Sequence, residues 1–220
     1  MQNQVVADVA IVLVGGPSSR MGESKALFEI DGKPMLIHVI ESLYDSGISK
    51  AILSFKNQKQ SSEIVDKLNL KRSGNKYFFP SIPIPFYLIF DKENNQLKNS
   101  AITGLIEPIN FAMKNGWGTV QITPCDVPYI SPNLPKLLFS KLSLEIDCVV
   151  PKTSKGLEPL LICAKTTPLL TSLQKGREAA HQVISEMKNL ELTSKDWINV
   201  GISESSFTNI NSKAELIKNK

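Results

Sequence analysis

The chain has 220 residues, of which 42% are apolar and 21% are charged, a composition typical of a globular protein with a sizeable core. The formal net charge of +4 is too small, and the charges are too scattered, to indicate a nucleic-acid partner. One small basic patch, Lys71, Arg72 and Lys76, is expected to be a solvated loop. Because no basic stretch opens the chain and Asp8 interrupts its first apolar run, we expect no signal peptide and no membrane span. We therefore predict a cytoplasmic protein with a single domain over residues 1–220.

Apolar runs of strand length alternate with helical patterns through the first half of the chain. The unbroken apolar run 9–13 predicts a buried strand, and the spacing of apolar residues between Pro34 and Gly47 predicts a helix. Further strands are expected at 51–55, 86–90 and 119–123, and further helices at 61–69 and at 100–115, the latter kinked at Pro108. This alternation predicts a parallel sheet with helices on both faces.

The second half of the chain is less regular. Helices are expected at 131–141, 167–176 and 178–188, and strands at 148–151, 160–164 and 197–201. Ser212 and Glu215 have the spacing of a capping box for a last helix. The proline-rich stretch 79–85 is expected to be an irregular surface loop.

The first predicted strand runs directly into a loop rich in glycine, serine and basic residues, "LVGGPSSRMGESK" at 13–25. Its spacing matches neither a Walker phosphate loop nor a G-x-G-x-x-G dinucleotide motif. Gly15 and Gly16 would let backbone N–H groups face a phosphate, and Arg20 and Lys25 would add positive charge at the carboxyl end of a strand. The loop is interpreted as a polyphosphate site; the alternative is a glycine turn with solvated basic residues.

A second candidate site follows the predicted strand 119–123. There Asp126 lies between Pro124 and Pro128, and prolines restrict the backbone on both sides of the acid. A carboxylate at the same edge of the sheet as a phosphate loop predicts Mg²⁺ held jointly by Asp126 and nucleotide phosphates. The alternative is an aspartate with a role only in the turn.

These segments together resemble the molybdenum cofactor guanylyltransferases, the molybdopterin-guanine dinucleotide biosynthesis protein A family of Rossmann-like nucleotidyltransferases. The likeness lies in 13–25, in "GKP" at 32–34, in "PCDVP" at 124–128 and in the segment from Phe207, and it spans nearly the whole chain. It implies an α/β, three-layer Rossmann-like fold with a mostly parallel central sheet. It also implies transfer of GMP from GTP to the terminal phosphate of molybdopterin, with release of pyrophosphate. That phosphate is mostly ionised at neutral pH, so no general base is required.

The resemblance also implies roles for particular residues. The nucleotide would contact Leu13, Val14, Gly15, Gly16, Lys25, Asp91 and Asp126. Arg20, Lys25 and Asp126 would be catalytic, with Asp126 binding Mg²⁺, and Asn209 and Asn211 would bind substrate on the molybdopterin side. A carboxylate at Asp91 can accept hydrogen bonds from guanine or from ribose hydroxyls. Cofactor-delivery proteins and recipient molybdoenzymes are the further partners implied; nucleic acid and membrane are not.

Some residues depart from the family pattern, and alternatives stay open. Val14 replaces an alanine, the turn at 100–104 keeps only Gly104 of a Gly-Pro-Leu-Ala-Gly pattern, and a proline is missing after Asn211. Because this turn follows Asp91, its altered sequence leaves open whether Asp91 has the nucleotide-binding role of the family position. The alternatives are a cytidylyltransferase, a nucleotidyltransferase with a sugar phosphate acceptor, and a non-catalytic nucleotide-binding homologue. The glycine pair and the Pro-Cys-Asp tripeptide favour the guanylyl reaction over the cytidylyl one.

The cysteines and histidines predict no further chemistry. Three widely spaced cysteines indicate reduced thiols, neither a disulfide framework nor a zinc site. His38 and His181 have no potential ligand at metal-binding spacing, so we expect no metal role for either.

Overall fold

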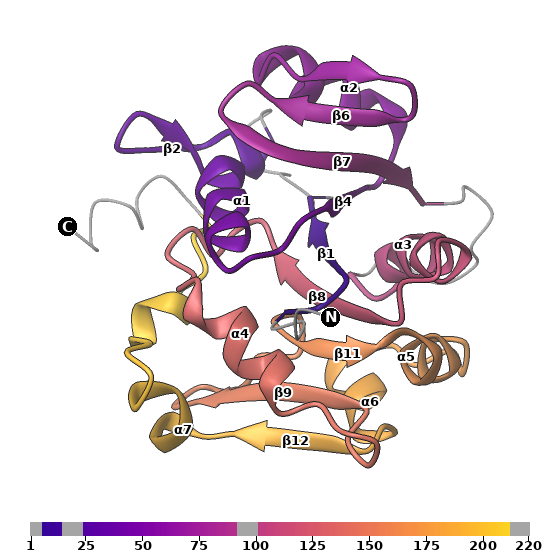
Figure 1. Ribbon diagram of the computed structural model, residues 1–220, viewed down its shortest axis with the longest axis vertical. Helices are drawn as coiled ribbons and strands as arrows, with labels where there is room; N and C mark the ends of the chain where they lie inside the picture. The colour runs from indigo at the N-terminus through magenta and orange to yellow at the C-terminus, as the bar shows by residue number, and fades with distance from the viewer. Residues whose placement is uncertain (1–5, 15–23, 92–100, 212–220) are drawn as a thin grey trace, which may run out of the picture.

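A large mixed sheet forms the centre of the protein in the computed structural model, which describes residues 6–14, 24–91 and 101–211 (Figure 1). The strand order is β10-β9-β11-β8-β1-β4-β7-β6-β5, with β12 beside β9. The four central strands run parallel: β8 (Thr119–Pro124), β1 (Val9–Leu13), β4 (Ala51–Phe55) and β7 (Ile82–Phe90). The expected α/β fold with a largely parallel core is confirmed.

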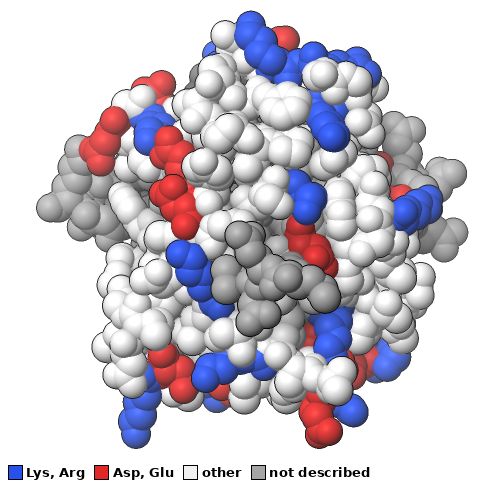
Figure 2. Space-filling view, viewed as in Figure 1, with Lys and Arg blue, Asp and Glu red and all other residues white. Residues whose placement is uncertain are grey.

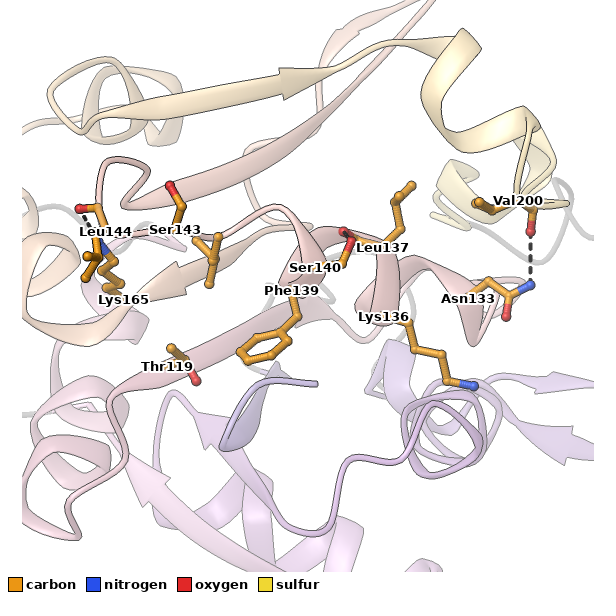
Figure 3. A pocket seen from close by; sticks show the side chains of 11 residues that line it. Thr119, Asn133, Lys136, Leu137, Phe139, Ser140, Ser143, Leu144, Lys165 and Val200 are labelled. Atoms are coloured by element: carbon orange, nitrogen blue, oxygen red, sulfur yellow. Dashed lines mark hydrogen bonds between the residues drawn. The ribbon is translucent and has the colours of Figure 1, made fainter. Parts of the chain in front are cut away.

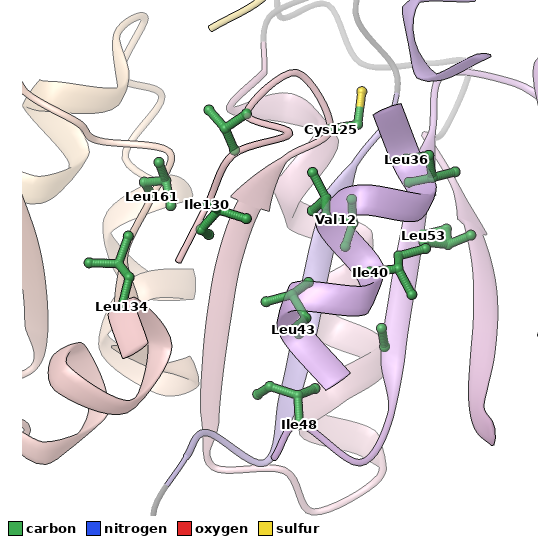
Figure 4. Packing of buried hydrophobic residues seen from close by; sticks show 14 of the residues in the cluster. Val12, Leu36, Ile40, Leu43, Ile48, Leu53, Cys125, Ile130, Leu134 and Leu161 are labelled. Atoms are coloured by element: carbon green, nitrogen blue, oxygen red, sulfur yellow. The ribbon is translucent and has the colours of Figure 1, made fainter. Parts of the chain in front are cut away.

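Helices cover both faces of this sheet. Ala10 and Val12 of β1 face a core formed with α1 (Met35–Asp45), α2 (Gln58–Lys67) and α4 (Asn133–Ser140). Val9 and Ile11 face the opposite core, formed with α3 (Thr103–Lys114), α5 (Thr166–Leu173) and α6 (Ala180–Ser185). Side chains alternate between faces along a strand, so an entirely apolar strand fills both cores. Figure 4 shows Val12 and Leu53 packed beside Leu36, Ile40 and Leu43 of α1.

Most predicted elements of the first half are present. The strands predicted at 9–13 and 51–55 are β1 and β4, and Pro108 lies within α3 as expected. Helix α2 begins earlier than predicted because the side chain of Asn57 caps it, accepting a hydrogen bond from the N–H of Gln60 at 3.0 Å. The remaining strands and short helices are β2 (Glu29–Ile30), β3 (Lys33–Pro34), β9 (Cys148–Thr153), β10 (Gly156–Leu157), β11 (Cys163–Lys165), η1 (Lys25–Leu27) and η2 (Glu204–Phe207).

The expectation of an irregular loop at 79–85 is wrong, because this stretch turns from β6 (Lys76–Phe79) into β7. Ile82, Ile84 and Phe86 are buried, while Pro83 is exposed and Pro85 half-buried, so the prolines occupy the outer face of an alternating strand. Residues 82–85 pair only with β6, whereas β4 pairs with β7 from Phe86 onward. Proline is tolerated where one side of a strand needs no ladder hydrogen bond. The basic patch is likewise exposed but carried on β5 (Lys71–Ser73) and β6.

The strand expected at 197–201 is also wrong, since this region belongs to α7 (Ser194–Ile198) and a following turn. The Asp196 side chain accepts a hydrogen bond from the Thr193 N–H at 2.7 Å, which begins the helix. Trp197 is only 1% exposed and packs against Phe207 with ring centroids 5.1 Å apart. The late strand is β12 (Asn189–Leu192), parallel to β9.

Three further observations concern the charges on one face, the length of the helices and the chain end. Charged side chains of both signs are spread over the face shown in Figure 2, in keeping with their scatter along the sequence. Across the described ranges, none of the helices has both the length and the apolar character to cross a membrane. The predicted capping box of Ser212 and Glu215 lies outside the described residues.

Candidate functional site

The site is built at the edge of the sheet where the central parallel strands end. The Cys125 N–H, just past β8, donates to the Leu13 carbonyl at the end of β1, at 3.0 Å. The Val14 N–H donates to the Ser54 carbonyl in β4 at 2.9 Å, and the Asp91 N–H to the Phe55 carbonyl at 3.1 Å. These bonds bring Leu13, Val14, Asp91 and Asp126 to one edge, the edge at which α/β sheets bind ligands.

Lys25 lies at this edge, in the short helix η1. Its ammonium nitrogen is 2.6 Å from Asn211 Oδ1 and 3.8 Å from Asp126 Oδ2. The side chains of Lys25 and Asp126 are 24% and 23% exposed, so solvent or a ligand can reach both. The structure therefore brings together three residues that the sequence singled out from widely separated segments.

The segment before Asn211 is fixed to the same place by Ile210. The N–H of Ile210 donates to the carbonyl oxygen of Asp126 at 2.8 Å. Its side chain is fully buried in a small cluster with Phe28, Ile30 and Met35. Because Phe28 follows η1 directly, one cluster supports both Lys25 and Asn211.

Asp126 is a carboxylate with little solvation. Burial raises its pKa above the ordinary value of 3.8, although Lys25 and hydrogen bonds oppose that rise. A cation placed against Asp126 would compensate for the solvation that burial removes. Its oxygens are the ligands that Mg²⁺ prefers, and Mg²⁺ is commonly held by one or two carboxylates together with substrate phosphates. Asp126 thus has the chemistry and the accessibility of such a ligand.

Asp91 forms a second acidic position, past the end of β7. Its pKa is raised chiefly by burial, with Lys56 opposing and Glu107 adding to the rise. Asp91 Oδ1 is buried and makes no hydrogen bond within the described residues. A Cβ added at Gly104 would lie 3.7 Å from this oxygen. Although the sequence of the turn at 100–104 departs from the family pattern, Gly104 lies beside Asp91 Oδ1, which accepts no hydrogen bond within the described residues.

Two supporting residues were missed from the sequence. Ser54 donates from Oγ to the Gly104 carbonyl at 2.7 Å and so ties β4 to the start of α3. Gln60 donates from Nε2 to the Val14 carbonyl at 3.0 Å. The sequence could have indicated Ser54, since it is the one polar residue in the strand Ala51–Phe55. No sequence feature could have indicated Gln60, because a glutamine in the first turn of a helix is common on any surface.

The other predicted site residues either lie outside the described part of the chain or are not joined to this group. Gly15, Gly16 and Arg20 lie outside the described residues. Asn209 is exposed, and no hydrogen bond within the described part of the chain joins it to Lys25 or Asp126. In the same ranges, no three His, Cys, Asp or Glu side chains gather closely enough to hold a metal by themselves.

Two other features lie near or beyond the site. Cys125 is buried, and burial raises the pKa of its thiol to about 12, so it is not a nucleophile at neutral pH. A groove beside α4, lined by Leu137, Phe139 and Leu144 among others, lies at the opposite end of β8, where Thr119 begins that strand (Figure 3). The groove is therefore separate from the strand-end site.

The sequence of this chain is similar to a known protein family and to named relatives. A sequence model described as the MobA-like NTP transferase domain matches residues 10–190. A probable molybdenum cofactor guanylyltransferase of Natranaerobius thermophilus is 28% identical, with 94% of this chain and 92% of that protein covered. One from Pyrococcus horikoshii is 29% identical, with 94% of this chain and 96% of that protein covered.

Solved structures share the fold. Molybdopterin-guanine dinucleotide biosynthesis protein A from Archaeoglobus fulgidus superposes with a TM-score of 0.69 at 19% identity, covering 96% of this chain and 95% of that one. The 4-diphosphocytidyl-2C-methyl-D-erythritol synthase from Anaerococcus prevotii has a TM-score of 0.67 at 13% identity, covering 98% and 97%. At these identities the likeness shows the fold alone.

Proposed function

This chain belongs to the MobA-like NTP transferase family, and we propose that it transfers GMP from GTP to molybdopterin with release of pyrophosphate. A nucleotidyltransferase with an NTP substrate follows from the family. The choice of guanine and of molybdopterin is the proposal, and it is supported by the names of the relatives from Natranaerobius thermophilus and Pyrococcus horikoshii. The product would be the guanine dinucleotide form of the cofactor.

One observation carries the proposal: Lys25 and Asp126 lie together, partly exposed, at the strand-end edge beside Leu13 and Val14. An ammonium and a carboxylate at this edge can serve a magnesium-bound triphosphate, the first by meeting phosphate oxygens and the second by holding the ion. When bound there, Mg²⁺ would neutralise the charge that develops on the departing pyrophosphate.

The remaining roles follow from position. Leu13 and Val14, with Gly15 and Gly16, would lie along the nucleotide, and Arg20 would add a second positive charge at the phosphates. Asp91, whose Oδ1 makes no hydrogen bond within the described residues, would accept hydrogen bonds through its carboxylate from guanine N–H groups or from ribose hydroxyls.

The acceptor and its partners complete the proposal. Asn209 and Asn211 would lie on the molybdopterin side, where the attacking phosphate is ionised and needs no general base. Cofactor-delivery proteins and recipient molybdoenzymes would be the partners of this single-domain enzyme.

Thermal shift measurements test the nucleotide part of this proposal directly. A ligand that binds only the native state adds about 2.7 kcal/mol of stability at roughly a hundredfold excess over its Kd. We expect GTP with Mg²⁺ to raise the Tm more than CTP, ATP or UTP with Mg²⁺. A larger shift with CTP would favour the cytidylyl reaction, and equal shifts would remove the guanine preference while leaving a triphosphate site.

A further inference from the structure

The hydrogen bond between Lys25 and Asn211 joins residues 186 positions apart in the chain. At 2.6 Å the bond is short, and its donor carries a full charge. Asn211 Oδ1 accepts the bond, because the ammonium of Lys25 can only donate. Asn211 therefore directly contacts the ammonium group that is the candidate phosphate-binding cation.

The position of Asn211 is set by residues on both sides of the site. Ile210 precedes it, bonded through its N–H to the Asp126 carbonyl at 2.8 Å and buried against Phe28 and Met35. The carboxamide thus rests on the same support as η1 and on the backbone of Asp126. A residue held in this way can fix the direction of a flexible lysine side chain, which otherwise loses rotamer freedom when it binds a ligand.

The chemistry of an amide fits this task better than that of an acid. A carboxylate at position 211 would add a second negative charge beside Lys25, next to that of Asp126, and would repel phosphates. The neutral amide orients the ammonium and leaves its charge available to a triphosphate. Because an ammonium has three donors, Lys25 can keep its bond to Asn211 while it donates to phosphate oxygens.

We propose that Asn211 is a positioning residue for Lys25: it holds the ammonium beside Asp126, so that the late segment 207–211 completes the triphosphate site as well as bordering the acceptor. This inference rests on the proposed function, since it concerns the same site. It differs from a contact to the acceptor alone, because it requires Asn211 to affect nucleotide binding when no acceptor is present.

Calorimetric titration with GTP and Mg²⁺, without acceptor, tests the inference. Asn211→Ala is expected to weaken GTP binding about tenfold, the typical effect of losing a hydrogen bond to a charged group, and to leave guanosine binding unchanged. Asn75→Ala is the control, being an exposed asparagine in the turn between β5 and β6, and should bind GTP as the parent does. Asn211→Asp should also weaken GTP binding, through charge repulsion.

A double-variant cycle separates an effect through Lys25 from an independent one. If Asn211 acts by positioning Lys25, Asn211→Ala adds no further loss in the Lys25→Ala background. Unchanged or tighter GTP binding in Asn211→Ala, or a full additional loss in the double variant, would overturn the inference.

A test that needs no nucleotide is to measure, by mass spectrometry, how fast lysine side chains are acylated. Asn211→Ala should speed modification of Lys25 and leave Lys33, which pairs with Glu41, unchanged. Equal Lys25 labelling in parent and variant would overturn the inference even if no nucleotide bound. Failure of the parent to bind GTP would instead count against the proposed function.

Discussion

The backbone N–H of Cys125 donates a hydrogen bond to the carbonyl oxygen of Leu13 at 3.0 Å, although the two residues are 112 positions apart in the chain. Leu13 ends the strand that leads into the glycine-rich stretch, and Cys125 precedes Asp126. The bond therefore joins the two segments that the sequence marks as candidate sites. It makes them one site, with a cationic side and an acidic side.

Loss of the Lys25 ammonium should weaken triphosphate binding selectively. Lys25→Ala is expected to reduce the affinity for GTP at least about tenfold and to leave guanosine binding nearly unchanged, because only GTP carries the charge that the ammonium meets. Titration of both ligands measures the difference. Lys33→Ala, at a half-buried lysine paired with Glu41, is the control and should bind GTP like the parent. Equal losses for GTP and guanosine would show a general disturbance of the site.

A methyl group at Gly104 should obstruct the nucleotide without unfolding the protein. The added Cβ would lie 3.7 Å from Asp91 Oδ1 and from Ser54 Oγ, which are ordinary contact distances, so Gly104→Ala should keep a melting temperature close to the parent's. It would crowd the Asp91 carboxylate and should weaken GTP binding several-fold.

Gly118→Ala is the matched control for this substitution. Its Cβ would lie 3.8 Å from a carboxylate oxygen of Asp8, at the other end of β8. Equal GTP affinities for the two variants would show that Asp91 does not face the nucleotide.

The partly buried charge of Asp126 should cost stability in the absence of ligand. Its pKa is raised because burial outweighs the attraction of Lys25, so the folded protein binds this proton more tightly than the unfolded chain does. The resulting penalty is absent below the ordinary pKa of 3.8 and is complete above the raised pKa. Asp126→Asn should therefore raise the Tm at pH 7, and the gain should shrink as the pH falls toward 3.8. A lower Tm at pH 7 would mean that the ion pair outweighs burial.

The cysteines should be unreactive until the chain unfolds. All three are buried, and burial raises the pKa of Cys125 and Cys148 to about 12 and that of Cys163 well above 9.0. Treatment of the folded protein with an alkylating reagent at pH 8, read by mass spectrometry, should modify none of them. Denaturant should expose all three. Alkylation of Cys125 before unfolding would show that the Pro-Cys-Asp turn opens.

The central fold could be predicted because its signals are local. Apolar runs at β1 and β4 and the helical spacing in α1 specify their elements without help from distant residues. The first part of β7 could not be found this way, because two prolines outweigh a good alternation until β6 is known to pair with it on one side. The strand predicted at 197–201 was wrong for a similar reason. A single aromatic residue such as Trp197 fits a strand or a helix, and its contact with Phe207, which the sequence does not reveal, distinguishes the two.

The site was only partly predictable. Parallel strands end at one edge, so the approach of Leu13 to Asp126 follows from the order of elements. Nothing local indicates that Asn211 bonds to Lys25, since that contact depends on how Ile210 packs against Phe28. The position of Asp91 beside Gly104 likewise depends on β4 and α3, which Ser54 connects.

The most direct test of the proposed reaction is a pyrophosphate-release assay with molybdopterin, Mg²⁺ and each of the four nucleoside triphosphates. We expect release that requires molybdopterin and Mg²⁺, is fastest with GTP, and is accompanied by formation of a molybdopterin guanine dinucleotide. Asp126→Asn, well folded by its melting curve, should lose most of this turnover and require more Mg²⁺ for what remains. Release that is faster with CTP, or that needs a sugar phosphate in place of molybdopterin, would contradict the account.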